Sequence, residues 1–381
     1  MEEAVRLTQE LVRIDSTNPG AGESGVEKYI LEYMKESGAE VITEEVYPGR
    51  SNVRIRIAGE KEAPALILVC HMDTVVEGNG WNCGPWDAVM EQGRIYGRGA
   101  CDMKSGLACA LSAVKKTAEA VKAGRSRLKH PLMLLCTVDE EGEMKGIEKA
   151  IDSGWLKQED WLLDLEPTNG QIQVSHKGRL WLLAAMNGIT AHASTPQKGA
   201  DAVAAAGEFI CEMRRRIAGC PSHPEMGNTT VTFGQIIGGY QPYVVPDECR
   251  IWLDIRLVPP TDEASVLKMA KEAALIVEER VPGVITEIKV TGSRPYIEAK
   301  DNTKLEGMLK EACQKVTGTV PDVRSFPGYT DTAVAAARLD NPNCMSYGPG
   351  NLKRAHKPDE YVEIQDILRC EQVILNLIES L

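Results

Sequence analysis

The chain has 381 residues, of which 43% are hydrophobic and 26% charged, and its formal net charge is −12. This length accommodates two domains with separate cores, and the composition is that of an ordinary folded protein rather than a disordered one. The negative charge argues against binding of nucleic acid or an anionic membrane by general electrostatic attraction.

The cysteines and the N-terminal residues indicate the cellular compartment in which the protein is expected. The eleven cysteines include no Cys-x-x-Cys pair, and several lie in apolar runs, where Cys acts as a small hydrophobe. A chain of this length does not need a disulfide framework, so a reducing compartment is the better interpretation. Residues 1–6 are acidic without a signal-peptide core, and no apolar stretch reaches the roughly 20 residues of a membrane helix. We expect a cytoplasmic protein.

The first half of the chain alternates between helical and extended patterns. Apolar spacing predicts a helix over 2–14, and Ser24 with Glu27 predicts a capping box that opens a second helix, which Gly38 closes. Continuous apolar runs predict strands that are buried on both faces. These runs are 65–70, 132–138 and 161–165, and we expect further extended segments over 40–46 and 52–57 and a helix over 103–121.

The pattern changes between residues 179 and 292, where strands and helices follow in the order β-α-β-β-α-β of a ferredoxin-like arrangement. The expected elements there are strands over 180–187, 229–237, 249–257 and 284–291, and helices over 200–218 and 262–280. Beyond this segment we expect helices over 301–316 and 330–338, a short strand over 344–347 and a final helix from about residue 363.

Polar residues gather just beyond the carboxyl ends of the predicted buried strands. In an open α/β sheet, this edge is where ligands bind. Imidazole and carboxylate groups without thiolates suit zinc or a related divalent ion at a catalytic site. The candidates at these strand ends are His71, Glu140, Glu141 and Glu166, and Asp102 and His356 lie in other loops.

Each candidate also has a simpler interpretation. His71 could be a polar residue at the start of a loop, and Asp102 could cap the helix that follows it. The acidic run 139–143 could be a solvated loop, and Asp164 is a rival to Glu166 as a ligand.

Five short motifs decide between these interpretations. They are His71-Met72-Asp73-Thr74, Gly97 to Lys104, Asp139-Glu140-Glu141-Gly142, Glu166-Pro167-Thr168 and Ala355 to Tyr361. In this order the motifs resemble the M20 family of metallopeptidases, and within it the acetylornithine deacetylases and succinyl-diaminopimelate desuccinylases. The resemblance runs over nearly the whole chain, and five motifs in order are far more specific than any one of them.

The resemblance implies an α/β architecture of two domains. A zinc-exopeptidase-like catalytic domain, with a central and mostly parallel sheet, would comprise residues 1–178 and 293–381. A smaller α+β ferredoxin-like lid and dimerisation domain over 179–292 would be inserted into it. The chain would then form a homodimer through the lid.

The resemblance also implies two Zn²⁺ ions per subunit, for which Co²⁺ or Mn²⁺ are alternatives. Asp102 would bridge the ions, with His71 and Glu166 on the first and His356 and Glu141 on the second. A metal-bridging water would be the nucleophile and Glu140 its general base.

Three further residues receive roles by the same resemblance. A carboxylate at Asp73 would hold the second imidazole nitrogen of His71. His192 would reach the active site of the other subunit and bind the oxyanion, and Arg256 would grip the substrate carboxylate. The simpler alternatives are a structural His in a lid loop and an exposed Arg at a sheet edge.

The expected reaction is hydrolysis of the amide bond of a small N-acyl amino acid. The alternative is a dipeptidase or carboxypeptidase that uses the same residues. A binding protein that has lost turnover is disfavoured, because Glu140 and all five expected ligands are present. Tyr243 stands where relatives often carry Asn before Val-Val-Pro-Asp, which leaves room for a different substrate.

Overall fold

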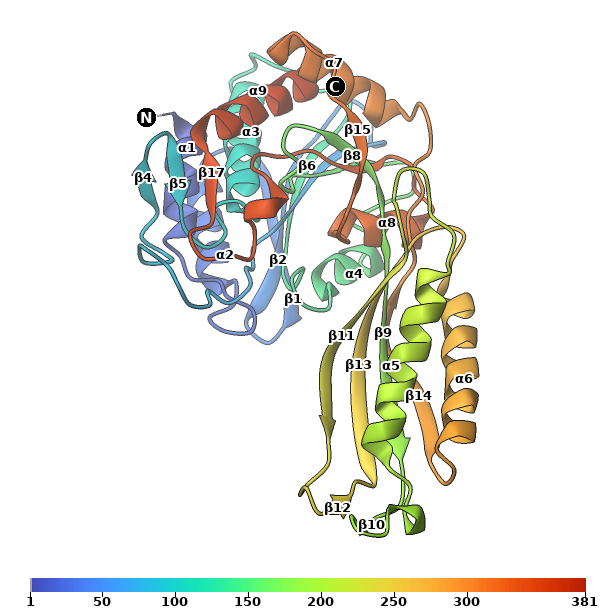
Figure 1. Ribbon diagram of the computed structural model, residues 1–381. Coiled ribbons are helices and arrows are strands. Elements are labelled where there is room, and N and C mark those ends of the chain that lie inside the picture. Colours follow the sequence, from blue (N-terminus) through green and yellow to red (C-terminus); the bar gives the residue numbers. More distant parts are fainter. Residues whose placement is uncertain (1) are drawn as a thin grey trace. The chain divides into compact units, whose positions relative to one another are not determined.

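The computed structural model describes residues 2–381, which form two compact units (Figure 1). The larger unit comprises residues 2–174, 299–326 and 330–381. The smaller unit comprises residues 175–298 and 327–329, so most of it is an insertion into the chain of the larger unit. Among the described residues, no helix is both long and apolar enough to cross a membrane.

The larger unit is built on an eight-stranded sheet. Its four central strands are parallel, and β1, β2 and β8 pair antiparallel with their neighbours. The fully buried patterns of β3 and β6 explain their central places, since a strand covered on both faces reads as a continuous apolar run. The expected parallel sheet is confirmed in this central part. The strands lie in the order β1 (Glu40–Tyr47), β2 (Arg50–Ile57), β6 (Leu132–Thr137), β3 (Leu66–His71), β7 (Trp161–Asp164), β16 (Cys344–Ser346), β8 (Ile172–His176) and β15 (Val323–Phe326).

Helices cover the sheet of the larger unit. Helices α1 (Glu3–Val12), α3 (Lys104–Lys122) and α9 (Ile364–Glu379) pack on one another, and α7 (Lys304–Thr317) packs on α9 (Figure 1). Helix α8 (Asp331–Leu339) contacts β3, β7, β16 and the short helix α4 (Lys145–Asp152).

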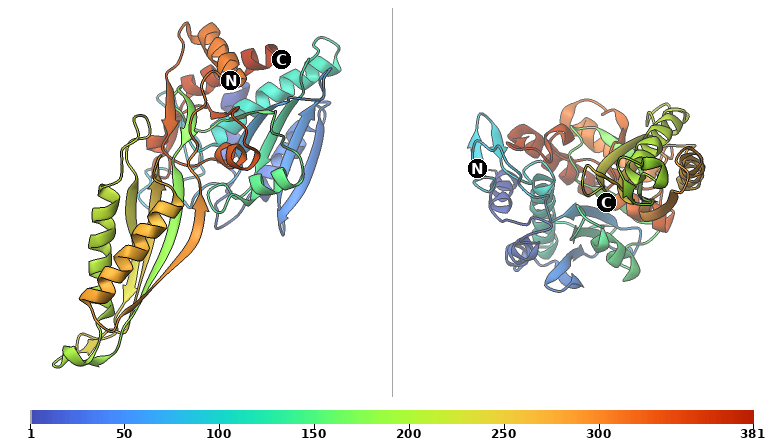
Figure 2. Two further views of the ribbon diagram at one scale, coloured as in Figure 1. Left: turned by 90° about the vertical axis from the view of Figure 1, so that its right-hand side faces the viewer. Right: turned by 60° about the horizontal axis from the view of Figure 1, so that its bottom comes forward.

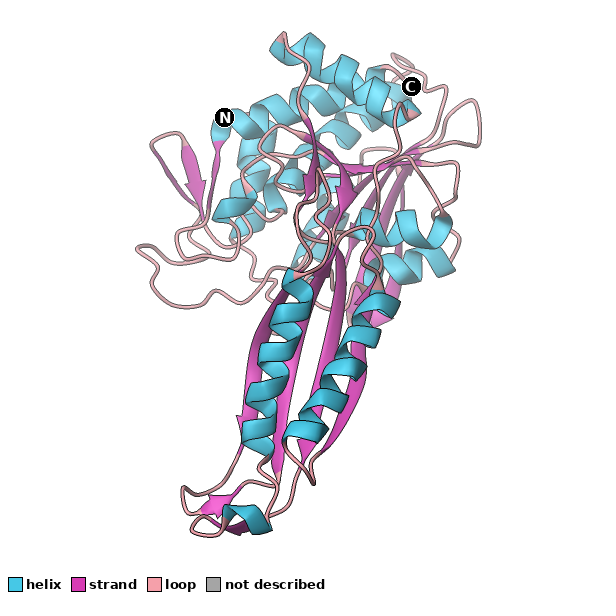
Figure 3. Ribbon diagram, turned by 45° about the vertical axis from the view of Figure 1, so that its right-hand side comes forward, coloured by secondary structure: helices cyan, strands magenta, loops and turns pink. Residues whose placement is uncertain are grey.

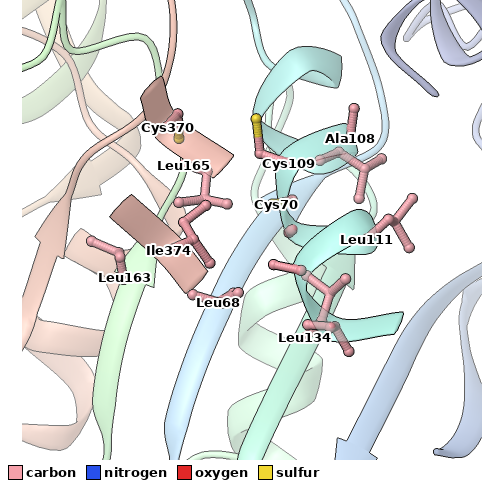
Figure 4. Packing of buried hydrophobic residues seen from close by; sticks show 14 of the residues in the cluster. Leu68, Cys70, Ala108, Cys109, Leu111, Leu134, Leu163, Leu165, Cys370 and Ile374 are labelled. Carbon is pink, nitrogen blue, oxygen red and sulfur yellow. The ribbon is translucent and has the colours of Figure 1, made fainter. Parts of the chain in front are cut away.

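Alternate residues of the central strands face α3 and α9. Leu68 and Cys70 of β3 lie in one buried cluster with Leu111 of α3 and Ile374 of α9 (Figure 4). Complete burial of a Leu or Ile side chain contributes about 1.5–3 kcal/mol, so this cluster holds the strands firmly in place. The strand ends that carry the candidate residues are therefore fixed by the core.

Two local predictions for helix α2 (Ser24–Met34) are wrong. Its N-cap is Glu23 rather than Ser24, and no side chain caps its first turn. Glu23 is buried instead, where it accepts two hydrogen bonds of 2.6 Å from Arg50. The tertiary ion pair thus overrides the local capping pattern. The helix ends at Met34, four residues before Gly38.

Several short elements had no clear pattern in the sequence. Strands β4 (Val89–Glu91), β5 (Arg94–Tyr96) and β17 (Tyr361–Glu363) form a small antiparallel sheet in the order β17-β5-β4. Two 3₁₀ helices span Pro196–Lys198 and Leu352–Arg354. Elements of three residues are too short to show a period.

The smaller unit is an antiparallel sheet with both of its long helices on one face (Figures 2 and 3). Its strand order is β11-β13-β9-β14, and the chain order β-α-β-β-α-β is the predicted ferredoxin-like one. Burial alternates along β9, because every second side chain faces the helices. A separate pair, β10 (Ala191–His192) with β12 (Val244–Val245), lies apart from this sheet. The main elements are β9 (Gly178–Asn187), α5 (Ala202–Ala218), β11 (Thr230–Gly238), β13 (Glu248–Leu257), α6 (Glu263–Arg280) and β14 (Ile285–Arg294).

Candidate metal centre

The candidate ligands of the larger unit meet at one edge of its sheet. His71 is the last residue of β3, Glu140 and Glu141 lie in the turn after β6, and Glu166 follows β7 by two residues. Because β3 pairs parallel with both β6 and β7, the carboxyl ends of the three strands share that edge. The rule that open α/β sheets bind ligands at this edge therefore applies here.

Two loops outside these strand ends complete the arrangement around Asp102. His71 Nε2 lies 3.1 Å from Asp102 Oδ1 and 3.6 Å from Glu166 Oε1. His356 Nε2 lies 3.3 Å from Asp102 Oδ2 and 3.0 Å from Glu141 Oε1. Each oxygen of Asp102 thus faces the Nε2 atom of one imidazole, and each of these Nε2 atoms also lies close to a glutamate, Glu166 for His71 and Glu141 for His356.

The spacing of these groups fits a divalent cation. Tetrahedral zinc with bonds of about 2.0–2.2 Å holds its ligand atoms about 3.3–3.6 Å apart. The separations between nitrogen and oxygen, 3.0–3.6 Å, are close to those edges. Ligand atoms of His71, Asp102 and Glu141 also lie within 4.8 Å of one another, as do those of His71, Glu140 and Glu166. The residues present therefore fit the donor set of a metal site.

The pKa values of the candidate ligands reflect the number of carboxylates that lie close together at the site. Burial raises the pKa of Glu166, and the carboxylate of Asp102 raises it further. Hydrogen bonds to Asp102 and Glu141 raise the pKa of His356 to about 10. Burial opposes the charged form of His71, yet Asp102 and the nearby glutamates raise its pKa above the ordinary value. A cation is the natural counter-charge for such a group of side chains.

Glu140 lies beside the candidate ligands in a buried position. Its ligand atom is within 4.8 Å of those of His71 and Glu166. Burial raises its pKa well above the ordinary value, His71 opposes that change, and Glu141 adds to it. A carboxylate in such surroundings is suited to take up and release a proton.

The contacts of Asp73 differ from the expected ones. Its carboxylate lies 3.7 Å from His71 Nδ1, which is too far for a hydrogen bond. His71 Nδ1 instead bonds the backbone carbonyl of Asp73 at 2.9 Å. The Asp73 carboxylate accepts the backbone N–H groups of Glu140 at 3.1 Å and Glu141 at 3.2 Å. Asp73 thus orients the imidazole with its main chain and the turn after β6 with its side chain.

A second buried carboxylate, Glu360, holds the loop of Asp102. Its Oε1 accepts the backbone N–H groups of Cys101 at 2.9 Å and Asp102 at 3.0 Å. Its Oε2 accepts a hydrogen bond of 2.5 Å from Arg98 Nη1. Burial raises the pKa of Glu360 to about 7, although Arg98 opposes that rise. Arg98 and Glu360 each lie in one of the five motifs. Their contact could not be predicted from a single sequence, because the two positions are 262 residues apart.

The rival ligand Asp164 has other partners. It is buried, and Oδ2 accepts a hydrogen bond from the hydroxyl of Thr332. Of the two rivals, Glu166 is the one whose carboxylate lies near His71.

Two predicted site residues belong to the smaller unit. His192 is exposed in β10, and its Nδ1 lies 2.8 Å from the hydroxyl of Ser194 and accepts the Ser194 N–H at 3.1 Å. Arg256 donates from Nε and Nη2 to the carboxylate of Asp254 at 2.8 and 3.2 Å. Tyr243 is exposed, and its carbonyl accepts the N–H of Ala193 at 3.0 Å. The catalytic and substrate-binding roles of His192 and Arg256 stay predictions.

The sequence of the chain matches a known protein family. Residues 67–380 match peptidase family M20/M25/M40. The chain belongs to the M20 family. An acetylornithine deacetylase from Myxococcus xanthus is 29% identical over 325 residues, which cover 81% of this chain and 78% of that protein. A probable succinyl-diaminopimelate desuccinylase from Staphylococcus aureus strain N315 is 25% identical over 391 residues, which cover 95% of this chain and 93% of that protein.

The fold agrees with the M20 assignment. A tripeptidase from Staphylococcus aureus Mu50 superposes with a TM-score of 0.81 at 24% identity, over 99% of this chain and 97% of that one. M20 metallopeptidases are metal-dependent, and this member carries a possible metal site in its larger unit. The protein is thus a hydrolytic enzyme.

Proposed function

We propose that the enzyme hydrolyses the amide bond of a small N-acyl amino acid with two zinc ions. One observation carries the metal part of the proposal, namely that the two oxygens of Asp102 each face a different imidazole. The names of the curated relatives, a deacetylase and a probable desuccinylase, support the acyl amino acid part. The products would be a carboxylic acid and a free amine.

The two ligand sets share Asp102. His71 and Glu166 would hold one ion with it, and His356 and Glu141 would hold the other. Bound ions of this kind polarise a carbonyl group and lower the pKa of water to about 7. Glu140 would accept a proton from the attacking water and deliver it to the departing nitrogen, a role typically worth about 10²–10⁴-fold in rate.

The smaller unit would supply the remaining groups. In this proposal Arg256 binds the carboxylate of the substrate, because a guanidinium suits bidentate carboxylate recognition. His192 would act in the active site of a second subunit, which requires a homodimer formed through the smaller unit, and we place this homodimer in the cytoplasm. Light scattering during turnover tests this arrangement, and an active monomer would exclude it.

A dipeptidase or carboxypeptidase is the second candidate. The catalytic groups of the larger unit act on the amide bond itself, so they do not distinguish an acyl group from an aminoacyl group. The similarity of the fold to that of a tripeptidase supports this second candidate. The residue at Tyr243 would then be a determinant of the choice, since it replaces an Asn of the expected motif.

A hydrolysis screen with mass-spectrometric detection tests the proposal. Zinc-loaded enzyme is incubated with N-acetyl, N-succinyl and longer N-acyl amino acids and with a set of dipeptides. Glu140→Gln is the control, because it preserves the size of the side chain and removes the base. Turnover of acyl amino acids by the wild type alone supports the proposal, and preference for dipeptides moves the assignment to a peptidase.

A further inference from the structure

The turn after β6 carries both the proposed base and a proposed ligand, so its position sets the geometry of the site. Asp139, which begins this turn, has a φ of 67°, a backbone conformation that non-glycine residues seldom adopt. The next two amides, of Glu140 and Glu141, are held by the carboxylate of Asp73. Whatever fixes Asp73 therefore fixes the two glutamates.

The side-chain amide of Asn18 adds a further link between Asp73 and this turn. Asn18 Nδ2 donates to Asp73 Oδ2 at 2.9 Å and to Asp139 Oδ1 at 3.0 Å. We propose that Asn18 is a positioning residue for the reaction, which sets the places of Glu140 and Glu141 through these two carboxylates. This inference rests on the proposed function only for the roles of the two glutamates.

The chemistry of the amide suits this task. Asp73 and Asp139 are both buried, and two buried carboxylates repel each other. A side-chain amide has two N–H donors, so one Asn can satisfy an oxygen of each carboxylate. The amide is neutral, and it therefore adds no charge that would compete with a metal ion nearby.

The main chain holds Asn18 in this position. Its backbone N–H donates to the carbonyl of Thr74 at 2.8 Å, and the neighbouring Thr17 forms a parallel bridge with Thr74. Asp73 precedes Thr74 directly, so the side chain of Asn18 is anchored beside its acceptor.

The two acceptors depend on Asn18 to different degrees. Asp139 has further partners, since Tyr47 donates to its Oδ2 at 2.9 Å and its own N–H donates to Glu23 Oε1 at 3.1 Å. Within residues 2–381, Asn18 is the one side chain that donates a hydrogen bond to the carboxylate of Asp73. Loss of Asn18 should therefore leave the turn folded and change mainly the place of Asp73.

Two substitutions test the proposal. Asn18→Ala removes both hydrogen bonds, and the nearly isosteric Asn18→Asp puts a third carboxylate against the other two. Substitution of groups that support metal ligands typically costs about 10–100-fold in activity or metal affinity. We expect kcat to fall by about that factor, with a larger fall for Asn18→Asp and no change in KM.

Asn341 provides a matched control in the same unit. It is buried, its Nδ2 donates to the carbonyl of Asp160 at 2.8 Å, and its Oδ1 accepts the N–H of Asn343 at 2.8 Å. Asn341→Ala thus also removes two side-chain hydrogen bonds, and it should keep the wild-type kcat even where it lowers the melting temperature. If Asn341→Ala lowered kcat as much as Asn18→Ala does, the effect of Asn18 would be a general structural one, and the proposal would be overturned.

A second measurement does not depend on turnover. The visible absorption spectrum of the Co²⁺-substituted protein reports the ligand geometry, and it should change in Asn18→Ala and not in Asn341→Ala. A wild-type spectrum in both Asn18 variants would overturn the proposal. If the wild-type enzyme hydrolysed nothing in the substrate screen, the proposed function would fail while this spectrum still decided the role of Asn18.

Discussion

Replacement of Arg98 by Met should destabilise the enzyme in a way that depends strongly on pH. Arg98 Nη1 lies 2.5 Å from Glu360 Oε2, and the side chains are only 2% and 0% exposed. Removal of one partner of a buried pair costs about 3–5 kcal/mol in free energy of unfolding, because an uncompensated charge stays behind. An exposed pair is worth only about 0–1 kcal/mol.

The pH dependence follows from the protonation of Glu360. Burial already raises its pKa to about 7 in the folded protein, above the ordinary value of 4.5, and loss of Arg98 raises it further. A carboxyl group with a raised folded pKa contributes stability at low pH, and that stability is lost as pH rises through the folded pKa. The destabilisation in Arg98→Met should therefore be largest near pH 8 and shrink towards pH 5, where Glu360 is protonated.

The assay is urea denaturation of the metal-free protein at both pH values, so that metal release does not contribute. Arg338→Met is the control, because Arg338 forms an exposed pair of 2.8 Å with Asp152 in the same unit. A loss below 1 kcal/mol for Arg98→Met, or an equal loss at pH 5 and pH 8, would refute the reasoning.

Three further predictions concern the ligands, the base and the smaller unit. Glu166→Gln should bind one metal ion fewer by elemental analysis, whereas Asp164→Asn should keep the wild-type content, and the opposite pattern would exchange their roles. Glu140→Gln should lower kcat by about 10²–10⁴-fold with metal content unchanged, and a loss of metal would make it a ligand instead. Burial lowers the pKa of His176 to about 3 in the folded protein, so the unfolded chain alone gains a proton as pH falls below about 6.5. Between pH 7 and pH 5 this proton uptake should lower the free energy of unfolding of the wild type by about 2 kcal/mol. Urea denaturation of His176→Gln should show a pH dependence without this loss. If the free energy of unfolding changed equally with pH in both proteins, the folded protein would also protonate His176, which contradicts the prediction.

The fold could be predicted where its determinants are local in the sequence. The apolar runs around Leu68 and Leu134 indicated buried parallel strands, and the residues that follow such strands meet at one edge by geometry. The residues of the candidate metal centre, such as His71 and Glu166, could be proposed because their motifs follow in the order of the family that the sequence resembles. Local pattern failed at Ser24, where the buried ion pair of Glu23 with Arg50 decided how the helix begins.

The supporting contacts could not be predicted for a physical reason. Arg98 and Glu360 are in contact although 262 positions separate them in the sequence, and the residues around either one do not indicate its partner. The pattern His-x-Asp placed Asp73 near His71, but it did not say whether the carbonyl or the carboxylate makes the contact. Asn18 lies in a turn-forming cluster, where Asn is common for its backbone conformation alone.

The central claim is a pair of metal ions bridged by Asp102. Anomalous diffraction at the zinc edge from crystals of the zinc-loaded enzyme tests it most directly. We predict two anomalous peaks about 3.5–4 Å apart, one beside His71 and Glu166 and the other beside Glu141 and His356, with Asp102 between them. A single peak, or two peaks that do not share Asp102, would contradict the claim.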